Sequence, residues 1–110
     1  MLIYKIFRAD EWADLQTNGE TDGAPIDVAD GYIHFSTAET VERTAAMYFA
    51  DVTDLVLVAV ESEGLEPVKW EEARGGQLFP HLYRKMRMDD VVWSKALPLV
   101  DGAHQFPQLT

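Results

Sequence analysis

Apolar residues follow the two-residue period of β-strands at several places along the chain. The stretch LIYKIF at residues 2–7 alternates between two largely apolar faces, with Lys5 as its one charged member. The stretch LVLVAV at residues 55–60 is apolar at every position, which is typical of a central strand buried on both faces. Further strands are predicted at residues 32–35, 68–71, 79–86 and 91–100.

Two helices are predicted, both in the first half of the chain. Asp10 can cap the first helix, and Gly19 follows its end. The second helix is expected to begin at Ser36, which forms an S-x-x-E capping box with Glu39. Its apolar face is predicted to carry Val41, Ala45, Tyr48 and Phe49.

The remaining segments predict loops. Residues 17–30 are rich in Gly, Asp, Pro and Thr, which indicates a surface loop. Residues 101–110 lack periodicity, and we expect them to form a loose, irregular tail. The predicted element order is β-α-β-α-β-β-β-β, which indicates a single α+β domain over residues 1–110.

Charge is distributed unevenly along this acidic chain, which carries a net charge of −10. Residues 1–64 hold three basic and thirteen acidic residues, whereas residues 65–110 hold six of each. An acidic protein is repelled by phosphate backbones, so nucleic acids are not expected as partners. The basic residues between positions 74 and 87 still provide a local place for a small anion.

Cysteine and long apolar runs are both missing from the sequence. Without cysteine there are no disulfides, thiol nucleophiles or thiolate metal sites. A membrane helix needs about 18 consecutive apolar residues, and no run here approaches that length. The first residues also lack the order of a signal peptide. We therefore expect a cytoplasmic protein that is not inserted in a membrane; the sequence does not fix its oligomeric state.

His34 is the first candidate for a functional side chain, in the stretch GYIHFST at residues 31–37. In a strand it shares a face with Tyr32 and Ser36. One interpretation is a half-buried histidine whose hydrogen bonds are satisfied within the protein. The other is a ligand contact beside the start of the following helix, where free N–H groups favour anions.

His81 is the second candidate, in the stretch FPHLY at residues 79–83. It shares a strand face with Tyr83, and Arg84, Lys85 and Arg87 follow closely. One interpretation is the start of a strand with a solvated basic edge. The other is a platform that stacks on a planar ring, with arginines nearby to bind phosphate.

Other catalytic arrangements find less support in the sequence. His34 and His81 belong to no recognised metal-binding pair, so no metal site is assigned. Ser36 follows a strand and precedes a helix as a hydrolase nucleophile does, but the flanking glycines of G-x-S-x-G are missing. Glu71 is a candidate carboxylate, against the simpler interpretation of a solvated charge.

Three stretches together carry a family resemblance: DGYIHFSTAETVERTAAMYF, DLVLVAVE and VKWEEARGGQLFPHLY. They resemble the bacterial domain-of-unknown-function family 952, from Ile3 to about Leu99. That family resembles the ADP-ribosyltransferase superfamily in fold. The resemblance implies two small, mainly antiparallel sheets around a cleft for NAD, with two early helices.

The resemblance also implies roles for individual residues. Catalytic roles fall to Glu71 and His34. Ligand-binding roles fall to Lys5, Ser36, Thr37, Arg74, His81 and Tyr83. Lys5 stands where many relatives carry histidine, which argues against a role that needs a neutral imidazole there.

Two functional hypotheses follow. In the first, the protein is an NAD-dependent transferase or hydrolase: Glu71 stabilises the charge that develops on the ribose, and Arg74 with Arg84 or Arg87 binds the pyrophosphate. NAD is then the substrate, and no cofactor is assigned. In the second, the same scaffold is a non-catalytic module that binds a nucleotide-like metabolite or a protein partner. A purely structural interaction domain is a third option.

Overall fold

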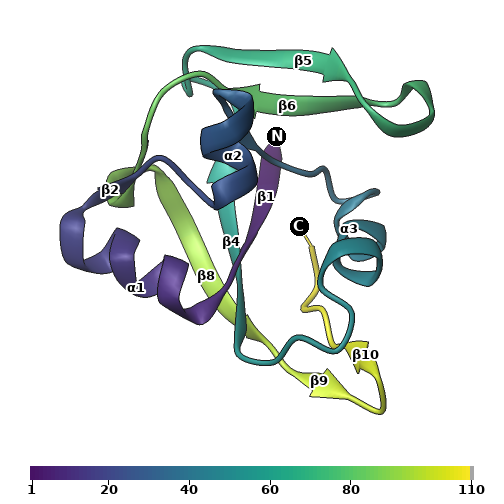
Figure 1. Cartoon of the computed structure of the whole chain (residues 1–110). Coiled ribbons are helices and arrows are strands. Elements are labelled where there is room, and N and C mark those ends of the chain that lie inside the picture. The colour runs from purple at the N-terminus through teal and green to yellow at the C-terminus, as the bar shows by residue number, and fades with distance from the viewer. Residues whose placement is uncertain (110) are drawn as a thin grey trace.

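The protein is a mixed α+β structure of three α-helices and several small antiparallel sheets (Figure 1). The computed structural model describes residues 1–109, with the side chain of Arg74 outside the described part. The helices are α1 (Ala9–Asn18), α2 (Pro25–Asp30) and α3 (Val41–Tyr48). The longer strands are β1 (Leu2–Phe7), β4 (Leu55–Glu61), β5 (Val68–Glu72), β6 (Leu78–Leu82) and β8 (Val91–Leu97). The shorter ones are β2 (Glu20–Thr21), β3 (Ile33–His34), β7 (Met86–Arg87), β9 (Leu99–Val100) and β10 (Ala103–His104).

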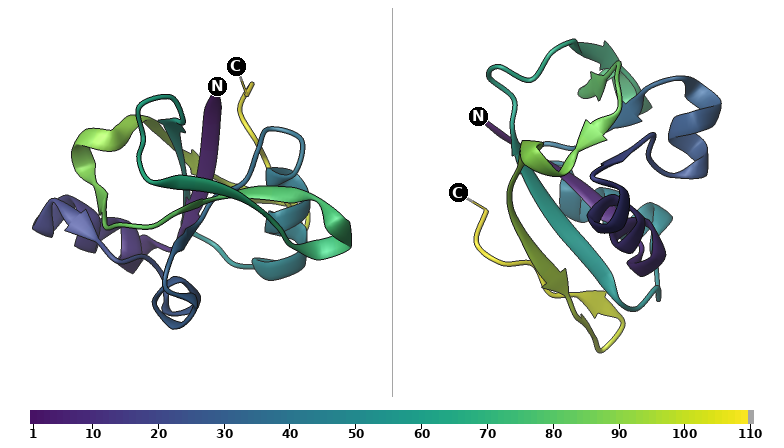
Figure 2. Two further views of the ribbon diagram at one scale, coloured as in Figure 1. Left: turned by 90° about the horizontal axis from the view of Figure 1, so that it is seen from above. Right: turned by 90° about the vertical axis from the view of Figure 1, so that its left-hand side faces the viewer.

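The central sheet has the order β1-β4-β8, and both of its pairings are antiparallel. The prediction of a buried central strand at LVLVAV is confirmed, because β4 lies between two partners and packs apolar side chains on both faces. Val58 and Val60 face the cluster that contains Leu15 of α1, whereas Leu57 and Ala59 face the cluster that contains Ala45 of α3. Helices α1 and α3 consequently cover opposite faces of this sheet (Figure 2).

A second sheet of order β3-β6-β5 lies across one end of the molecule, above the central sheet in Figure 1. Its strands pair antiparallel, with Ile33 opposite Leu82 and His34 opposite His81. Ile33 and Leu82 are buried in the cluster beneath the sheet. Because side chains alternate along a strand, the two histidines project from the opposite face. This sheet therefore separates an apolar core from a histidine-bearing surface.

Residues 17–30 contain more regular structure than the predicted loop. They form β2, which pairs with β7, and the short helix α2. Pro25 occupies the first turn of α2, where its missing N–H costs nothing, and the carboxylate of Asp27 accepts a hydrogen bond from the backbone N–H of Ala24 at 2.7 Å. The helix ends at Gly31, whose φ of 84° suits the left-handed cap. The predicted pair of early helices thus becomes three.

The start of α3 also differs from the prediction. Ser36 does not cap the helix, because its backbone is paired with Tyr4 of β1 through hydrogen bonds of 2.8 and 2.7 Å. The helix instead begins at Val41, after a turn in which the hydroxyl of Thr40 accepts a hydrogen bond from the N–H of Thr37 at 3.0 Å. Of the predicted apolar face, Val41 and Ala45 are buried but Tyr48 is exposed.

Smaller corrections concern the two ends of the chain. Helix α1 begins two residues earlier than expected, with Arg8 in place of Asp10 at the cap position, and the carboxylate of Glu11 accepts the N–H of Arg8 at 2.9 Å. Residues 101–109 differ from the expected loose tail, since β10 pairs with β9 and Phe106 and Leu109 pack against the core on the α3 side of the central sheet. None of the helices within residues 1–109 has the length and apolar character needed to cross a membrane.

Gly23 provides a test of how tightly α2 is fixed. A Cβ added at Gly23 would overlap the carboxylate of Asp27, whereas one added at Gly19 would meet open space. Both glycines have positive φ, 95° and 78°, so replacement by alanine costs each about 1–2 kcal/mol in backbone strain. We expect Gly23→Ala to lower the free energy of unfolding by at least about 1 kcal/mol more than Gly19→Ala, as measured by urea denaturation. Equal losses in the two variants would contradict this packing.

Candidate functional site

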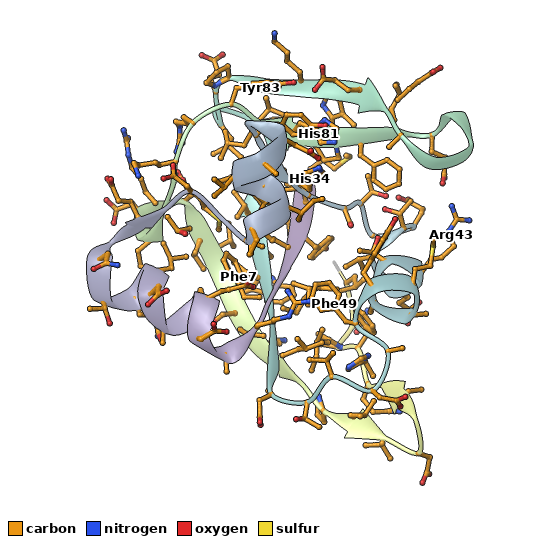
Figure 3. The ribbon with its side chains drawn as sticks, in the orientation of Figure 1. Phe7, His34, Arg43, Phe49, His81 and Tyr83 are labelled. Carbon is orange, nitrogen blue, oxygen red and sulfur yellow. The ribbon has the colours of Figure 1, made fainter. Side chains whose placement is uncertain are left out.

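His34 and His81 lie side by side on the face of the β3-β6-β5 sheet that points away from Ile33 and Leu82 (Figure 3). They are directly opposite each other in the strand pairing, and their ring centroids are 5.2 Å apart with the rings edge to face. Tyr83 follows β6 on the same side. The sequence hypothesis that FPHLY and GYIHFST contribute to one site required this proximity, and the register of β3 on β6 provides it.

Tyr32 completes this group of rings, although the sequence analysis assigned it no role. Its ring stacks on His81 with centroids 4.2 Å apart, and lies 4.7 Å from the ring of His34 and 5.1 Å from that of Tyr83. The available signal was its position two residues before His34, which places both on one strand face. We call Tyr32, His34, His81 and Tyr83 the His–Tyr cluster.

His34 is held at both ring nitrogens. Its Nδ1 lies 2.6 Å from Oδ1 of Asp27, and its Nε2 lies 3.0 Å from Oδ2 of Asp30. Carboxylates only accept hydrogen bonds, so both contacts are complete when both nitrogens carry a proton. The side chain of His34 is 33% exposed, and these two carboxylates of α2 fix its orientation.

Lys5 supports His34 and does not reach the open face of the cluster. Its Nζ lies 2.9 Å from Oδ2 of Asp27 and donates to the carbonyl oxygen of His34 at 3.1 Å. Lys5 and Asp27 are both buried, so this ion pair is shielded from water. The structure therefore places Lys5 behind His34, where it fixes the backbone of that residue.

The buried carboxylate of Asp27 is the electrostatic centre of this support. Burial by itself raises the pKa of Asp27, but the hydrogen bonds from His34 and the charge and hydrogen bond of Lys5 outweigh it and lower the pKa to about 2. Sequence pattern did not identify Asp27 as a site residue, because it lies in a segment with the composition of a loop.

Glu71 organises the other half of the cluster. One of its oxygens, Oε1, lies 2.9 Å from Nδ1 of His81 and accepts a hydrogen bond from the hydroxyl of Tyr83 at 2.6 Å. Both hydrogen bonds lower the pKa of Glu71 below its usual value, and the one from Tyr83 has the larger effect. In return, Glu71 raises the pKa of Tyr83 to about 12. His81 is only 3% exposed, whereas Glu71 is 38% exposed.

Ser36 and Thr37 are not part of the cluster. The Oγ of Ser36 is 3.2 Å from Oγ1 of Thr44, and the Oγ1 of Thr37 is 3.0 Å from Oγ1 of Thr40. Both side chains are buried at the entry to α3, so their contacts are those of a structural turn. The ligand contacts predicted for them are not reproduced by this geometry.

The basic residues after His81 also behave differently from the prediction. Arg84 binds Asp90 through two hydrogen bonds of 3.0 and 3.1 Å, and its Nε donates to the carbonyl of Glu66, so it is not available for a pyrophosphate. The side chain of Arg74 lies outside the described residues. Lys69, which the sequence analysis did not single out, is opposite His81 in the β5-β6 pairing, and its Nζ is 4.9 Å from the ring centre of Tyr83.

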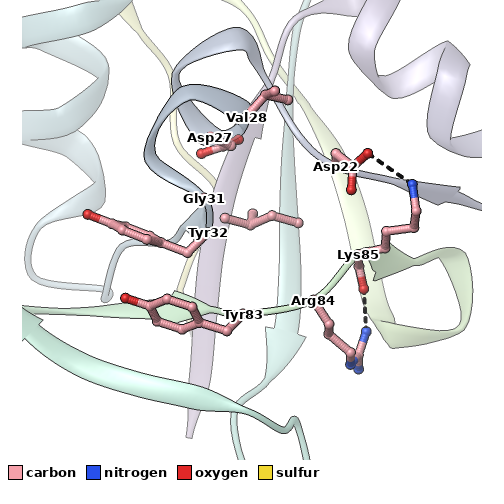
Figure 4. A pocket seen from close by; sticks show the side chains of 9 residues that line it. Asp22, Asp27, Val28, Gly31, Tyr32, Tyr83, Arg84 and Lys85 are labelled. Carbon is pink, nitrogen blue, oxygen red and sulfur yellow. Dashed lines mark hydrogen bonds and ion pairs between the residues drawn. The ribbon is translucent and has the colours of Figure 1, made fainter.

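A pocket of about 190 Å³ adjoins the two tyrosines (Figure 4). Tyr32 and Tyr83 form one side, and an ion pair of 2.9 Å between Lys85 and Asp22 lies at another. Asp27 and Gly31 also contribute to its lining. Within residues 1–109 we find no group of three or more His, Asp or Glu side chains placed to hold a metal ion. The site is thus an aromatic and histidine-rich surface beside a small pocket.

The ionisation of Asp27 gives the fold a defined response to acid. A carboxylate whose pKa falls from 3.8 to about 2 contributes stability that is complete above pH 3.8 and is lost as the pH falls through about 2. The size of this contribution is about 2 kcal/mol. We expect the wild-type protein to lose that much more stability than Asp27→Asn between neutral pH and pH 2, as measured by denaturation.

A direct titration serves as the control for this prediction, and it holds even if Asp27→Asn does not fold. The carboxyl carbon of Asp27, followed by NMR in the wild-type protein, should titrate with a midpoint near 2. The carboxyl carbon of Asp30, which lies on the same helix and is 40% exposed, provides the internal comparison. A midpoint for Asp27 at or above 3.8 would contradict the buried network.

Comparison with known proteins identifies relatives of the same fold. The chain is similar to protein CC0527 from Caulobacter crescentus in its X-ray crystal structure, with 45% sequence identity and a TM-score of 0.91, over 96% of this chain and 94% of that one. The solution NMR structure of CC0527 matches with 43% identity and a TM-score of 0.84, over 94% and 90% of the two chains. Among proteins with curated descriptions, none matches. The family model described as "Protein of unknown function (DUF952)" matches residues 6–94. The chain therefore belongs to the DUF952 family.

Proposed function

We propose that the His–Tyr cluster binds a nucleotide-like ligand, with NAD as the first candidate. One observation carries this proposal: two histidine and two tyrosine rings gather on one sheet face, and each histidine is held by a carboxylate. Such rings can stack on a planar base, while imidazole nitrogens and tyrosine hydroxyls can bond to sugar hydroxyl groups.

The size of the neighbouring pocket limits what part of the ligand it can accept. An apolar cavity of about 150 Å³ accommodates benzene. The pocket beside Tyr32 and Tyr83 measures about 190 Å³, which suits one planar ring and is too small for a dinucleotide. The remainder of the ligand would lie across the open face of the sheet. Lys69, exposed beside Tyr83, is placed to neutralise a phosphate there.

The resemblance in fold to the ADP-ribosyltransferase superfamily that we expect for this family favours NAD over other nucleotides in this proposal. Cleavage of the bond between nicotinamide and ribose develops positive charge on the ribose, which a nearby carboxylate stabilises. Glu71 is suited to this role because it is a partly exposed carboxylate beside the rings, and the hydrogen bonds from Tyr83 and His81 lower its pKa further from neutral pH. In this proposal the catalysed reaction is either transfer of ADP-ribose to an acceptor or hydrolysis of NAD.

A non-catalytic binding module is the second candidate, and a specific observation favours it. One oxygen of Glu71 already receives two hydrogen bonds, and both ring nitrogens of His34 face carboxylates. Groups satisfied in this way position a ligand well but are less available for chemistry on it. The two candidates share the ligand and differ in whether it is consumed.

An NMR titration with NAD tests the binding proposal. We expect the ring resonances of His34 and His81 to shift as NAD is added to millimolar concentration. The third histidine, His104, bonds the carbonyl oxygen of Val52 at 2.8 Å on a different part of the chain and provides an internal control that should not move. No shift at His34 or His81, or equal shifts at all three histidines, would refute the proposal.

The release of free nicotinamide separates the two candidates. If the protein binds NAD and releases nicotinamide faster than the uncatalysed reaction over days, the catalytic candidate is supported. If NAD is bound but remains intact, the binding module is supported and the enzyme is not. Glu71→Ala should abolish turnover in the first case.

Lys69 provides a test of the phosphate contact. Loss of one charged hydrogen bond on an exposed surface should weaken binding of NAD about tenfold in Lys69→Ala. Lys95 is a matched control, because its Nζ lies 5.1 Å from the ring centre of Trp93 in the central sheet, away from the cluster. Lys95→Ala should bind NAD like the wild type in isothermal titration calorimetry. Equal affinities of Lys69→Ala and the wild type for NAD would show that Lys69 does not contribute to binding.

A further inference from the structure

The two histidines of the cluster differ in how many of their nitrogens are already bonded. His34 faces a carboxylate oxygen with Nδ1 and another with Nε2. His81 faces a carboxylate only with Nδ1, at 2.9 Å from Glu71. Among the residues that the structure describes, no group hydrogen-bonds to Nε2 of His81. A buried nitrogen that no protein group bonds is unusual in a folded protein and is a candidate contact for a ligand.

The contacts of Glu71 determine which nitrogen of His81 carries the proton. An ionised carboxylate accepts hydrogen bonds and cannot donate, so the nitrogen that faces Oε1 must be N–H. The hydroxyl of Tyr83 donates to the same oxygen at 2.6 Å, which leaves the carboxylate in the role of acceptor for both. In a neutral imidazole with Nδ1 protonated, Nε2 has a free lone pair. Glu71 thereby sets the tautomer of His81.

The stacking of Tyr32 on His81 does not use that lone pair. Tyr32 stacks on the ring face of His81 at 28° between ring planes. The lone pair of an imidazole nitrogen lies in the plane of the ring, so stacking on the face does not occupy it. The side chain of His81 is 3% exposed, so a ligand atom that contacts Nε2 has to reach the edge of a nearly buried ring.

We propose that Nε2 of His81 accepts the proton of a hydroxyl group on the ligand or on an attacking molecule, with Glu71 as the positioning residue. The ligand class is a sugar-containing or other hydroxyl-bearing molecule; its identification with NAD rests on the proposed function above. This assignment gives His81 the role of proton acceptor, which neither Glu71 nor His34 was assigned above. His34, bonded at both nitrogens, has the role of a fixed neighbour.

For a glycosidic ligand the step balances in atoms and charge. The lone pair of Nε2 takes the proton of the attacking hydroxyl, which leaves His81 as an imidazolium beside the ionised Glu71. The oxygen forms a bond to the anomeric carbon of the ribose. The bond from that carbon to the ring nitrogen of nicotinamide breaks, and its electron pair neutralises the positive charge of the ring. A general base in such a position contributes about 10²- to 10⁴-fold to a rate.

The tautomer of His81 in the ligand-free protein is the first test. Long-range ¹H–¹⁵N NMR spectra distinguish a protonated from an unprotonated imidazole nitrogen. We expect a protonated Nδ1 and an unprotonated Nε2 for His81 in the neutral ring. In Glu71→Ala this single tautomer should give way to a mixture, whereas Glu72→Ala, the same change at the next and exposed residue of β5, should retain it. A protonated Nε2 with an unprotonated Nδ1 in the wild type would overturn the proposal.

Two probes then distinguish the proton acceptor from the identity of the ligand. D-ribose 5-phosphate supplies hydroxyl groups without nicotinamide, and NAD supplies both. We expect each probe to shift the ¹⁵N resonance of His81 Nε2 in the direction of an accepted hydrogen bond. If D-ribose 5-phosphate produces the shift and NAD does not, His81 is supported and NAD is refuted. If NAD shifts the resonances of His34 but leaves Nε2 of His81 unchanged, NAD is supported and the role of His81 is refuted. No response to either probe refutes both.

Discussion

The side chain of Asp27 connects helix α2 to strands β1 and β3. Its Oδ2 contacts the ammonium group of Lys5 on β1 and accepts a hydrogen bond from the N–H of Ala24. Its Oδ1 contacts both the backbone N–H and the ring Nδ1 of His34 on β3. A buried carboxylate is costly to remove from water unless its hydrogen bonds are satisfied, and here every contact is a donor. The helix, the edge of the central sheet and the histidine surface therefore depend on one another through this group.

The same network explains why Lys5 can occupy a strand that is otherwise apolar. Its charge is compensated within the protein, and its remaining contact is the carbonyl oxygen of His34, so it fixes the backbone from which the histidine projects. A ligand that contacts the His–Tyr cluster would meet side chains whose positions are already set. Such preorganisation reduces the entropy that binding must overcome.

Local pattern was sufficient to predict some elements and not others. The strand at LVLVAV was predictable because burial on both faces leaves a continuous apolar run. Helix α2 was not, because Ile26 and Val28 are exposed and the element is anchored by Asp27 instead of an apolar face. The capping box at Ser36 was outweighed by pairing with Tyr4, a partner that no local window contains. For the site, the two histidine motifs pointed to the right strands, but Tyr32, Asp27 and Lys69 take their places only through tertiary contacts.

The register between β3 and β6 has a consequence for how the site comes into being. Ile33 and Leu82 enter the core from one face of the sheet, and His34 and His81 leave it from the other. A slip of one residue in a single strand would exchange its two sets, turning a histidine into the apolar core and an aliphatic side chain away from it. The two histidines consequently pair only in the register that also places Ile33 and Leu82 in the core.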